Sequence, residues 1–227
     1  DAGAHVGVSS CFFCKQDDSR TVYAVEPMQT NIQRIKRKFG HLPNLHIIRA
    51  ALGSKKARVS EDQVEHRRGM LFEIQPVAEG KAYEKRLFDV QLVDDIFRDV
   101  KLAFARFDTH GNELDIIRGA NRTIVRDRPV AVLEIDPLVR NRHANELLRI
   151  FTEVYNYRAF FVPERAGEKN ERNIICVPRG RRMPPLLAQK TIEVSRRNFN
   201  GLNIRRLLRL TAFFRSTPRQ SAPRLRS

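Results

Sequence analysis

Cysteine is scarce in this chain of 227 residues, and long apolar runs are absent. Three cysteines are too few for a disulfide framework, and Cys176 has no neighbour to pair with in the sequence. Cys11 and Cys14 form a C-x-x-C pair, but no matching Cys/His pair lies nearby, so we interpret them as small core residues and expect no metal site. No run of about 18 apolar residues occurs, so no transmembrane helix is predicted.

An initiator methionine is also missing, and the chain begins inside a motif. Asp1 belongs to a glycine turn that normally follows a β-strand, and no residues for that strand are present. We therefore expect a strand ahead of Asp1 and interpret the chain as an N-terminally truncated fragment. Any targeting segment would lie upstream as well.

Positive charge is concentrated at the C-terminal end. Residues 179–227 hold 13 of the 42 Lys and Arg residues but one of the 26 acids, Glu193. We predict a globular domain over 1–178 and a basic, largely irregular tail over 179–227. Within the tail, residues 202–214 interleave Leu and Phe with Arg, which suits an anionic membrane surface or nucleic-acid phosphates. The alternative, a disordered extension, is favoured for residues 215–227.

Apolar strand patterns alternate with helical patterns along most of the chain, which predicts a doubly wound α/β fold with a mostly parallel sheet. Residues 54–91 are charged and irregular, with weak strand signals, and are interpreted as an insertion. The predicted strands are 22–25, 45–48, 102–107 and 129–135, with a closing hairpin of 159–162 and 173–177. The predicted helices cover 8–16 and 28–39, the face Leu114, Ile117, Ala120 and Ile124, and the face Leu147, Phe151 and Val154.

Small residues and strand-end acids point to a nucleoside site. Gly3 and Gly7 lie in a tight turn after Asp1, where the absence of a Cβ lets the backbone approach a ligand. Glu26 and Asp108 each follow an apolar strand, and the carboxyl ends of such strands face one crevice. Glu26 is placed to accept hydrogen bonds from two ribose hydroxyls.

The turn does not match a dinucleotide fingerprint. His5 occupies the position where G-x-G-x-x-G has its middle glycine, and the Asp1 charge would repel a pyrophosphate. This disfavours an NAD-dependent oxidoreductase. S-adenosylmethionine has no phosphate and carries a sulfonium and an ammonium, so the electrostatics favour a methyl donor.

Several motifs, in order and spacing, resemble the FkbM-type methyltransferases over residues 1 to about 178. The family patterns are roughly D-V-G-A-x-x-G, F-E-P, K-I-D-V-E-G-x-E-x-x-x-L-x-G-A and P-x-x-x-x-E. The corresponding segments here are Asp1-Ala-Gly-Ala-His-Val-Gly7, Ala24-Val-Glu-Pro27, Ala51-Leu-Gly53, Leu92-Val-Asp-Asp-Ile96, the run from Arg106 to Ala120, and Pro129-Val-Ala-Val-Leu-Glu-Ile135.

The resemblance implies a class I fold that uses S-adenosylmethionine, usually for O-methylation. It implies that Asp108 lies near the transferred methyl group. It also implies a cofactor site lined by Asp1, Gly3, Ala4, Gly7 and Glu26, with Ala51 near the adenine.

One departure from the family pattern concerns catalysis. The family's glutamate in D-V-E-G is His110 here, and its preceding lysine is Arg106, which keeps the charge. His110 is a candidate general base towards a substrate hydroxyl, because imidazole titrates near neutral pH; the alternatives are a surface residue, a changed substrate or lost activity.

Two further groups of acids have structural interpretations. Glu113 suits a helix's first turn and Glu134 a sheet end, while Asp94 and Asp95 are predicted to cap the short helix near residues 96–97.

The sequence therefore predicts methyl transfer from S-adenosylmethionine to an acceptor, with Asp108 or His110 as proton acceptor. The expected acceptor is a hydroxyl oxygen of a small molecule or glycan, and nothing in the sequence identifies it further. The alternative is a catalytically weakened domain whose basic tail binds nucleic acid or an anionic membrane.

Overall fold

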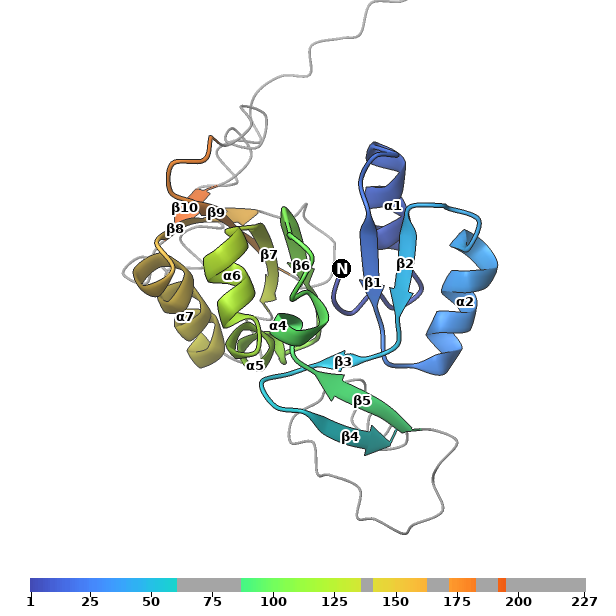
Figure 1. The fold of residues 1–227 in the computed structure, drawn as a ribbon. Helices are drawn as coiled ribbons and strands as arrows, with labels where there is room; N and C mark the ends of the chain where they lie inside the picture. The colour runs from blue at the N-terminus through green and yellow to red at the C-terminus, as the bar shows by residue number, and fades with distance from the viewer. Residues whose placement is uncertain (61–86, 136–140, 163–171, 183–191, 195–227) are drawn as a thin grey trace, which may run out of the picture.

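The computed structural model of this chain describes residues 1–60, 87–135, 141–162, 172–182 and 192–194. Its strands form a large sheet and a small one (Figure 1). The large sheet holds β1 (Val22–Val25), β2 (Leu45–Ile48), β6 (Phe104–Phe107), β7 (Val130–Ile135), β8 (Tyr157–Val162), β9 (Arg172–Pro178) and β10 (Ile192–Val194). The small sheet holds β3 (Ala51–Leu52), β4 (Ala57–Ser60) and β5 (Leu87–Gln91). The helices are α1 (Val8–Gln16), α2 (Gln29–Phe39), α4 (Val93–Ile96), α5 (Glu113–Arg118), α6 (Asn121–Asp127) and α7 (Asn141–Arg149).

Ala2 joins the two halves of the large sheet. It forms parallel bridges to Val25 on one side and to Phe107 on the other, so the N-terminal residues lie between β1 and β6 (Figure 1). The resulting order is β2, β1, Ala2, β6, β7, β9, β8, β10. Chain connections run outward in both directions from Ala2, which makes this the switch point at which doubly wound sheets bind ligands.

The sheet is parallel from β2 through β7, on both sides of Ala2, and antiparallel from β7 to β10. Pairs β1–β2 and β6–β7 are parallel, as predicted, whereas β9 is antiparallel to both β7 and β8. Strand β10 was not expected, because it lies within the predicted irregular tail. It pairs with β8, buries Val194, and places Glu193 within 2.8–2.9 Å of the Arg158 guanidinium. Residues 179–182 are also described, and the rest of the tail, including residues 202–214, lies outside the described residues.

The predicted helical face from Leu114 to Ile124 is buried as expected, but it belongs to two helices. Helix α5 ends at Gly119, where the chain packs against Gly53: a Cβ on Gly119 would lie 2.0 Å from the Gly53 carbonyl oxygen. This close approach requires glycine at position 119. The helix stops there, and α6 begins separately at Asn121.

A π-helical turn, Ile150–Val154, follows α7. Because of it, the predicted helical face of Leu147, Phe151 and Val154 is wrong at its last residue. Phe151 is fully buried as predicted, but Val154 is exposed and Tyr155 is buried instead. The Tyr155 amide donates to the Ile150 carbonyl at 2.9 Å, an i→i+5 bond that adds one residue to the turn. The added residue rotates the following side chains, so the inward position falls one residue later.

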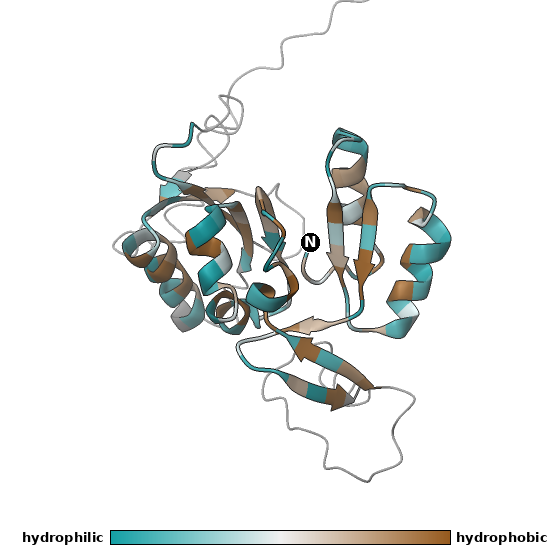
Figure 2. Ribbon diagram, in the orientation of Figure 1, coloured by the Kyte–Doolittle hydropathy of each residue, from teal (hydrophilic) through white to brown (hydrophobic). Residues whose placement is uncertain are grey.

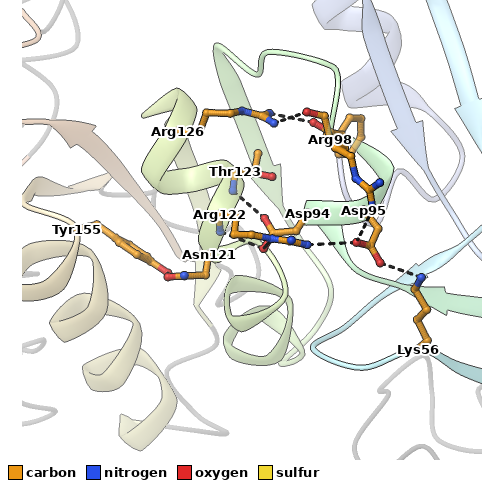
Figure 3. A network of polar contacts seen from close by, with 10 residues as sticks. Lys56, Asp94, Asp95, Arg98, Asn121, Arg122, Thr123, Arg126 and Tyr155 are labelled. Atoms are coloured by element: carbon orange, nitrogen blue, oxygen red, sulfur yellow. Dashed lines mark hydrogen bonds and ion pairs between the residues drawn. The ribbon is translucent and has the colours of Figure 1, made fainter.

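Charged residues around α4 fasten the small sheet to the rest of the domain (Figure 3). Asp94 accepts hydrogen bonds from the amides of Arg122 and Thr123 at 3.0 and 2.7 Å, so it caps the start of α6 rather than the predicted short helix. Asp95 pairs with Lys56 at 2.9 Å. The predicted insertion thus contributes β4 and β5 to a small sheet, and residues 61–86 lie outside the described residues.

Apolar residues concentrate on the strands and on the inward faces of the helices (Figure 2). The main core surrounds Ile116, Ile117, Leu133 and Leu148, each with no more than a trace of exposed surface. Within the described part of the chain, no helix combines the length and apolar character needed to cross a bilayer. Because the strands themselves are filled with apolar side chains, the polar groups lie in the loops at the carboxyl ends of β1, β6 and β7.

Candidate functional site

A turn over residues 3–7 lies against the carboxyl ends of β1 and β6. Gly3 and Gly7 have φ of +77° and +81°, and His5 between them has +51°, all left-handed backbone. A Cβ on Gly3 would lie 1.9 Å from the Asp108 carbonyl oxygen, so only glycine fits there. The predicted residues Gly3 and Asp108 are therefore in direct backbone contact.

Glu26 ties this turn to the start of α2. Its side chain is 4% exposed; one oxygen accepts from the His5 amide at 2.9 Å, and the other accepts from the Met28 amide at 3.0 Å and Asn31 Nδ2 at 3.2 Å. Burial raises the pKa of Glu26, while these three bonds act in the opposite direction. A carboxylate has about four acceptor sites, so about one remains for a ligand.

Arg106 links the turn to Asp108. Its guanidinium donates to Asp1 Oδ1 at 2.9 Å and also to Asp108 Oδ2. The other Asp1 oxygen accepts from Ser10 Oγ at 2.6 Å, and the Asp1 side chain is fully buried. The charge of Asp1 is thus offset within the protein, which weakens the argument that it repels a pyrophosphate.

The loop after β6 is held in a specific shape by Glu113. Oε1 of Glu113 accepts hydrogen bonds from the amide and hydroxyl of Thr109 at 2.9 and 3.0 Å and from the Gly111 amide at 3.2 Å. His110 lies between these anchors with φ +53°, a left-handed conformation that is rare for residues other than glycine. Glu113 was predicted as a helix first-turn residue, and it also positions His110.

Asp108, His110 and Glu134 come together at the ends of two neighbouring strands. Phe107 is in register with Leu133 in the parallel pair β6–β7, which places the next residues, Asp108 and Glu134, side by side. His110 Nδ1 lies 3.4 Å from Glu134 Oε2, and one ligand atom of each of the three residues lies within 4.8 Å of the others. Glu134 was not among the predicted site residues, although its position at a strand end matched that of Asp108.

These three side chains shift one another's protonation. Burial, followed by the neighbouring Glu134, raises the pKa of Asp108 to about 7. The Glu134 contact raises the pKa of His110 to about 9 against the effect of burial. Burial acts to raise the pKa of Glu134, but the contacts with His110 and Asp108 bring it below its usual value. The imidazole is therefore cationic at neutral pH, which favours Asp108 over His110 as a proton acceptor.

Ala51 reaches this region through packing rather than polar contact. It is buried in a cluster with Val59, Phe88 and Val90, against which Met28 packs. Because the Met28 amide is bound by Glu26, the cluster adjoins the acid that ends β1. The neighbouring Leu52 carbonyl accepts from Asn112 Nδ2 at 2.9 Å, which ties β3 to the His110 loop.

Cys11 and Cys14 do not take part in the site. Both are buried free thiols on α1, in keeping with their interpretation as small core residues, and Cys176 is also buried and free.

The residues present fit S-adenosylmethionine in two respects. Glu26 offers a remaining acceptor position at the strand tip, and the close packing of Gly3 on the Asp108 carbonyl brings the acids at the tips of β1 and β6 to the same turn. Parallel strands diverging from Ala2, a glycine turn and acids at the tips of β1 and β6 define a class I methyltransferase fold.

Comparison with known proteins identifies the family. The model of the methyltransferase FkbM domain matches residues 1–159, and the chain belongs to this family. A crystal structure of methyltransferase FkbM from Methylobacillus flagellatus KT has a similar fold, with a TM-score of 0.57 at 18% sequence identity. The match covers 78% of this chain but 42% of that protein, so the chain spans less than half of its length. No curated protein sequence matched.

Proposed function

We propose that this domain transfers a methyl group from S-adenosylmethionine to a hydroxyl oxygen of a small molecule or glycan. The observation that carries the proposal is the backbone contact between Gly3 and Asp108, because it sets the glycine turn directly beside an acid with a raised pKa. Glu26 is bonded to the amide of His5 in the middle of the same turn. Membership of the FkbM family supports methyl transfer in general.

Glu26 would hold the cofactor beside the turn, with Ala51 and Met28 forming apolar packing at its side. When bound, the cofactor supplies a methyl carbon on a sulfonium, which a nucleophilic oxygen can attack. Asp108 accepts the proton that the acceptor hydroxyl loses as its oxygen gains the methyl group. Arg106 fixes the Asp108 carboxylate, and Glu113 fixes the loop that carries His110. These contacts set the orientation that in-line transfer requires.

Titration calorimetry with S-adenosylhomocysteine tests the cofactor assignment on the whole chain. Binding by the wild type, lost or weakened in Glu26→Gln and retained in Asp89→Asn, supports it. Asp89 is a suitable control because it is an exposed acid of β5 paired with Arg58. Transfer of radiolabelled methyl groups to a panel of hydroxylated small molecules and glycans then tests the acceptor class. Absence of binding at millimolar ligand would overturn the proposal.

A further inference from the structure

Glu134 has an unmet bonding requirement at the end of β7. Its side chain is 8% exposed, and Oε2 is buried without a hydrogen-bond partner in the described part of the chain. Buried carboxylate oxygens are costly unless a donor or a cation satisfies them. The nearest charged group is His110 Nδ1, whose 3.4 Å separation is longer than a charge-assisted hydrogen bond. Glu134 Oε2 therefore has the His110 ion pair, but no donor among the described residues lies at hydrogen-bond distance.

Three groups that bind metal ions converge at that position. The ligand atoms of Asp108, His110 and Glu134 all lie within 4.8 Å of one another. Two ligands on one ion with bonds of about 2.1 Å lie at most about 4.2 Å apart, so small side-chain rotations suffice to bring all three onto one ion.

The local charge also suits a dication. Arg106 contacts both Asp1 and Asp108, so before His110 is counted its single positive charge leaves Asp1, Asp108 and Glu134 with two negative charges in excess when all three are ionised. Two carboxylates and one imidazole suit Mn²⁺, Fe²⁺ or Zn²⁺ better than an ion that prefers oxygen ligands alone.

The supporting contacts resemble those that orient metal ligands. Glu113 holds both residues that flank His110, so the imidazole sits on a braced loop despite its left-handed backbone. Arg106 holds one oxygen of Asp108 and leaves the other available. Such outer contacts fix ligand orientation before an ion arrives.

We propose that Asp108, His110 and Glu134 bind one divalent transition-metal ion, which holds the acceptor's oxygen. Three protein ligands leave coordination positions open, and acceptors with two adjacent oxygens would fill them best. This use of the ion rests on the proposed methyl transfer; the ion site itself does not. A metal-bound hydroxyl has a lowered pKa, so in the ion-loaded protein its proton leaves to solvent, and the role of Asp108 as proton acceptor applies to the metal-free protein.

The test uses the whole chain, stripped with a chelator and dialysed, with Mn²⁺ as the probe. Electron paramagnetic resonance and calorimetry should show one bound Mn²⁺ per chain, displaced by Zn²⁺, with Mg²⁺ binding more weakly. Glu134→Gln and His110→Asn should each lower Mn²⁺ affinity by about 100-fold or more, since even supporting residues of metal sites account for about 10- to 100-fold. Asparagine is chosen because it tolerates left-handed backbone at position 110.

The matched control is His41→Ala, an exposed histidine at the end of α2, which should leave Mn²⁺ affinity unchanged. Circular dichroism of each variant distinguishes the loss of a metal ligand from the loss of folding. If Glu134→Gln does not fold, His110→Asn still tests the site, because the His110 side chain is exposed. Absence of Mn²⁺ binding, or equal affinity in wild type and both variants, would overturn the metal site. S-adenosylhomocysteine binding measured on the same samples reports separately on the proposed function.

Discussion

The acids on the two sides of the turn over residues 3–7 differ in how their carboxylate oxygens are hydrogen-bonded. At β1, both oxygens of Glu26 accept hydrogen bonds from groups within the protein. At β6 and β7, Glu134 has a buried oxygen without any hydrogen bond, and Asp108 has a pKa raised to about 7. A preformed end suits binding of a constant ligand, whereas an unsatisfied end suits groups that gain or lose a proton or an ion. Under the proposed function, cofactor binding belongs to the tip of β1 and the chemistry to the tips of β6 and β7.

The strongest disruption of this arrangement should come from Gly3→Ala. The added Cβ would meet the Asp108 carbonyl oxygen at 1.9 Å on a backbone with φ +77°, so both ends of the turn must move. We expect a loss of about 2–5 kcal/mol in the free energy of unfolding, from overpacking and left-handed strain together.

Gly180→Ala is the control for strain alone. Gly180 has φ +90° with nothing within 4 Å of the added Cβ, so about 1–2 kcal/mol is expected. Urea unfolding of the two variants measures the difference. Equal losses would show that the contact between Gly3 and Asp108 is not tight.

Asp108→Asn should lower the rate of methyl transfer without changing cofactor binding. We expect methyl transfer to fall by about 10²- to 10⁴-fold, since the amide neither accepts the proton nor matches the carboxylate as a metal ligand. S-adenosylhomocysteine affinity should stay at the wild-type value, because the Glu26 end is untouched. Single-turnover rates and calorimetry check both, with Asp89→Asn as the control acid. A wild-type rate in Asp108→Asn would remove Asp108 from the chemistry.

Glu26→Gln should affect the binding end alone. Loss of one charged acceptor should weaken S-adenosylhomocysteine binding by about 1.5–3 kcal/mol. Mn²⁺ binding should persist, since Glu26 does not contact the cluster of Asp108, His110 and Glu134. Calorimetry with each ligand gives both numbers, and a parallel loss of both affinities would mean that the two ends are not separable.

The smallest effect is expected from Cys14→Ala. Cys14 is 1% exposed and lies on the buried face of α1, so the substitution should cost about 1 kcal/mol of unfolding free energy. Neither S-adenosylhomocysteine nor Mn²⁺ binding should change. A loss of either affinity would show that the C-x-x-C pair is more than packing.

Local sequence patterns predicted many of the strands and helices of the fold. Strands β1 and β2, helices α1 and α2, and the β8–β9 hairpin follow from apolar periodicity and turn residues, all of which act over short distances. The break at Gly119 and the π-helical turn before Tyr155 were missed, because each depends on a contact or a bond that periodicity does not contain. Strand β10 was missed for a related reason: its pairing partner, β8, lies 30 or more residues away.

The sequence by itself determined the family, the glycine turn and the acids at the strand ends, because these reside in residue types and short spacings. The tertiary structure decided which groups meet. The register of β6 and β7 set Asp108 beside Glu134, and the Glu113 bonds turned His110 towards both. Whether an acid is offset by hydrogen bonds, like Asp1 by Arg106, or has only an ion pair, like Glu134 Oε2 with His110, depends on atoms that folding brings together from distant parts of the chain.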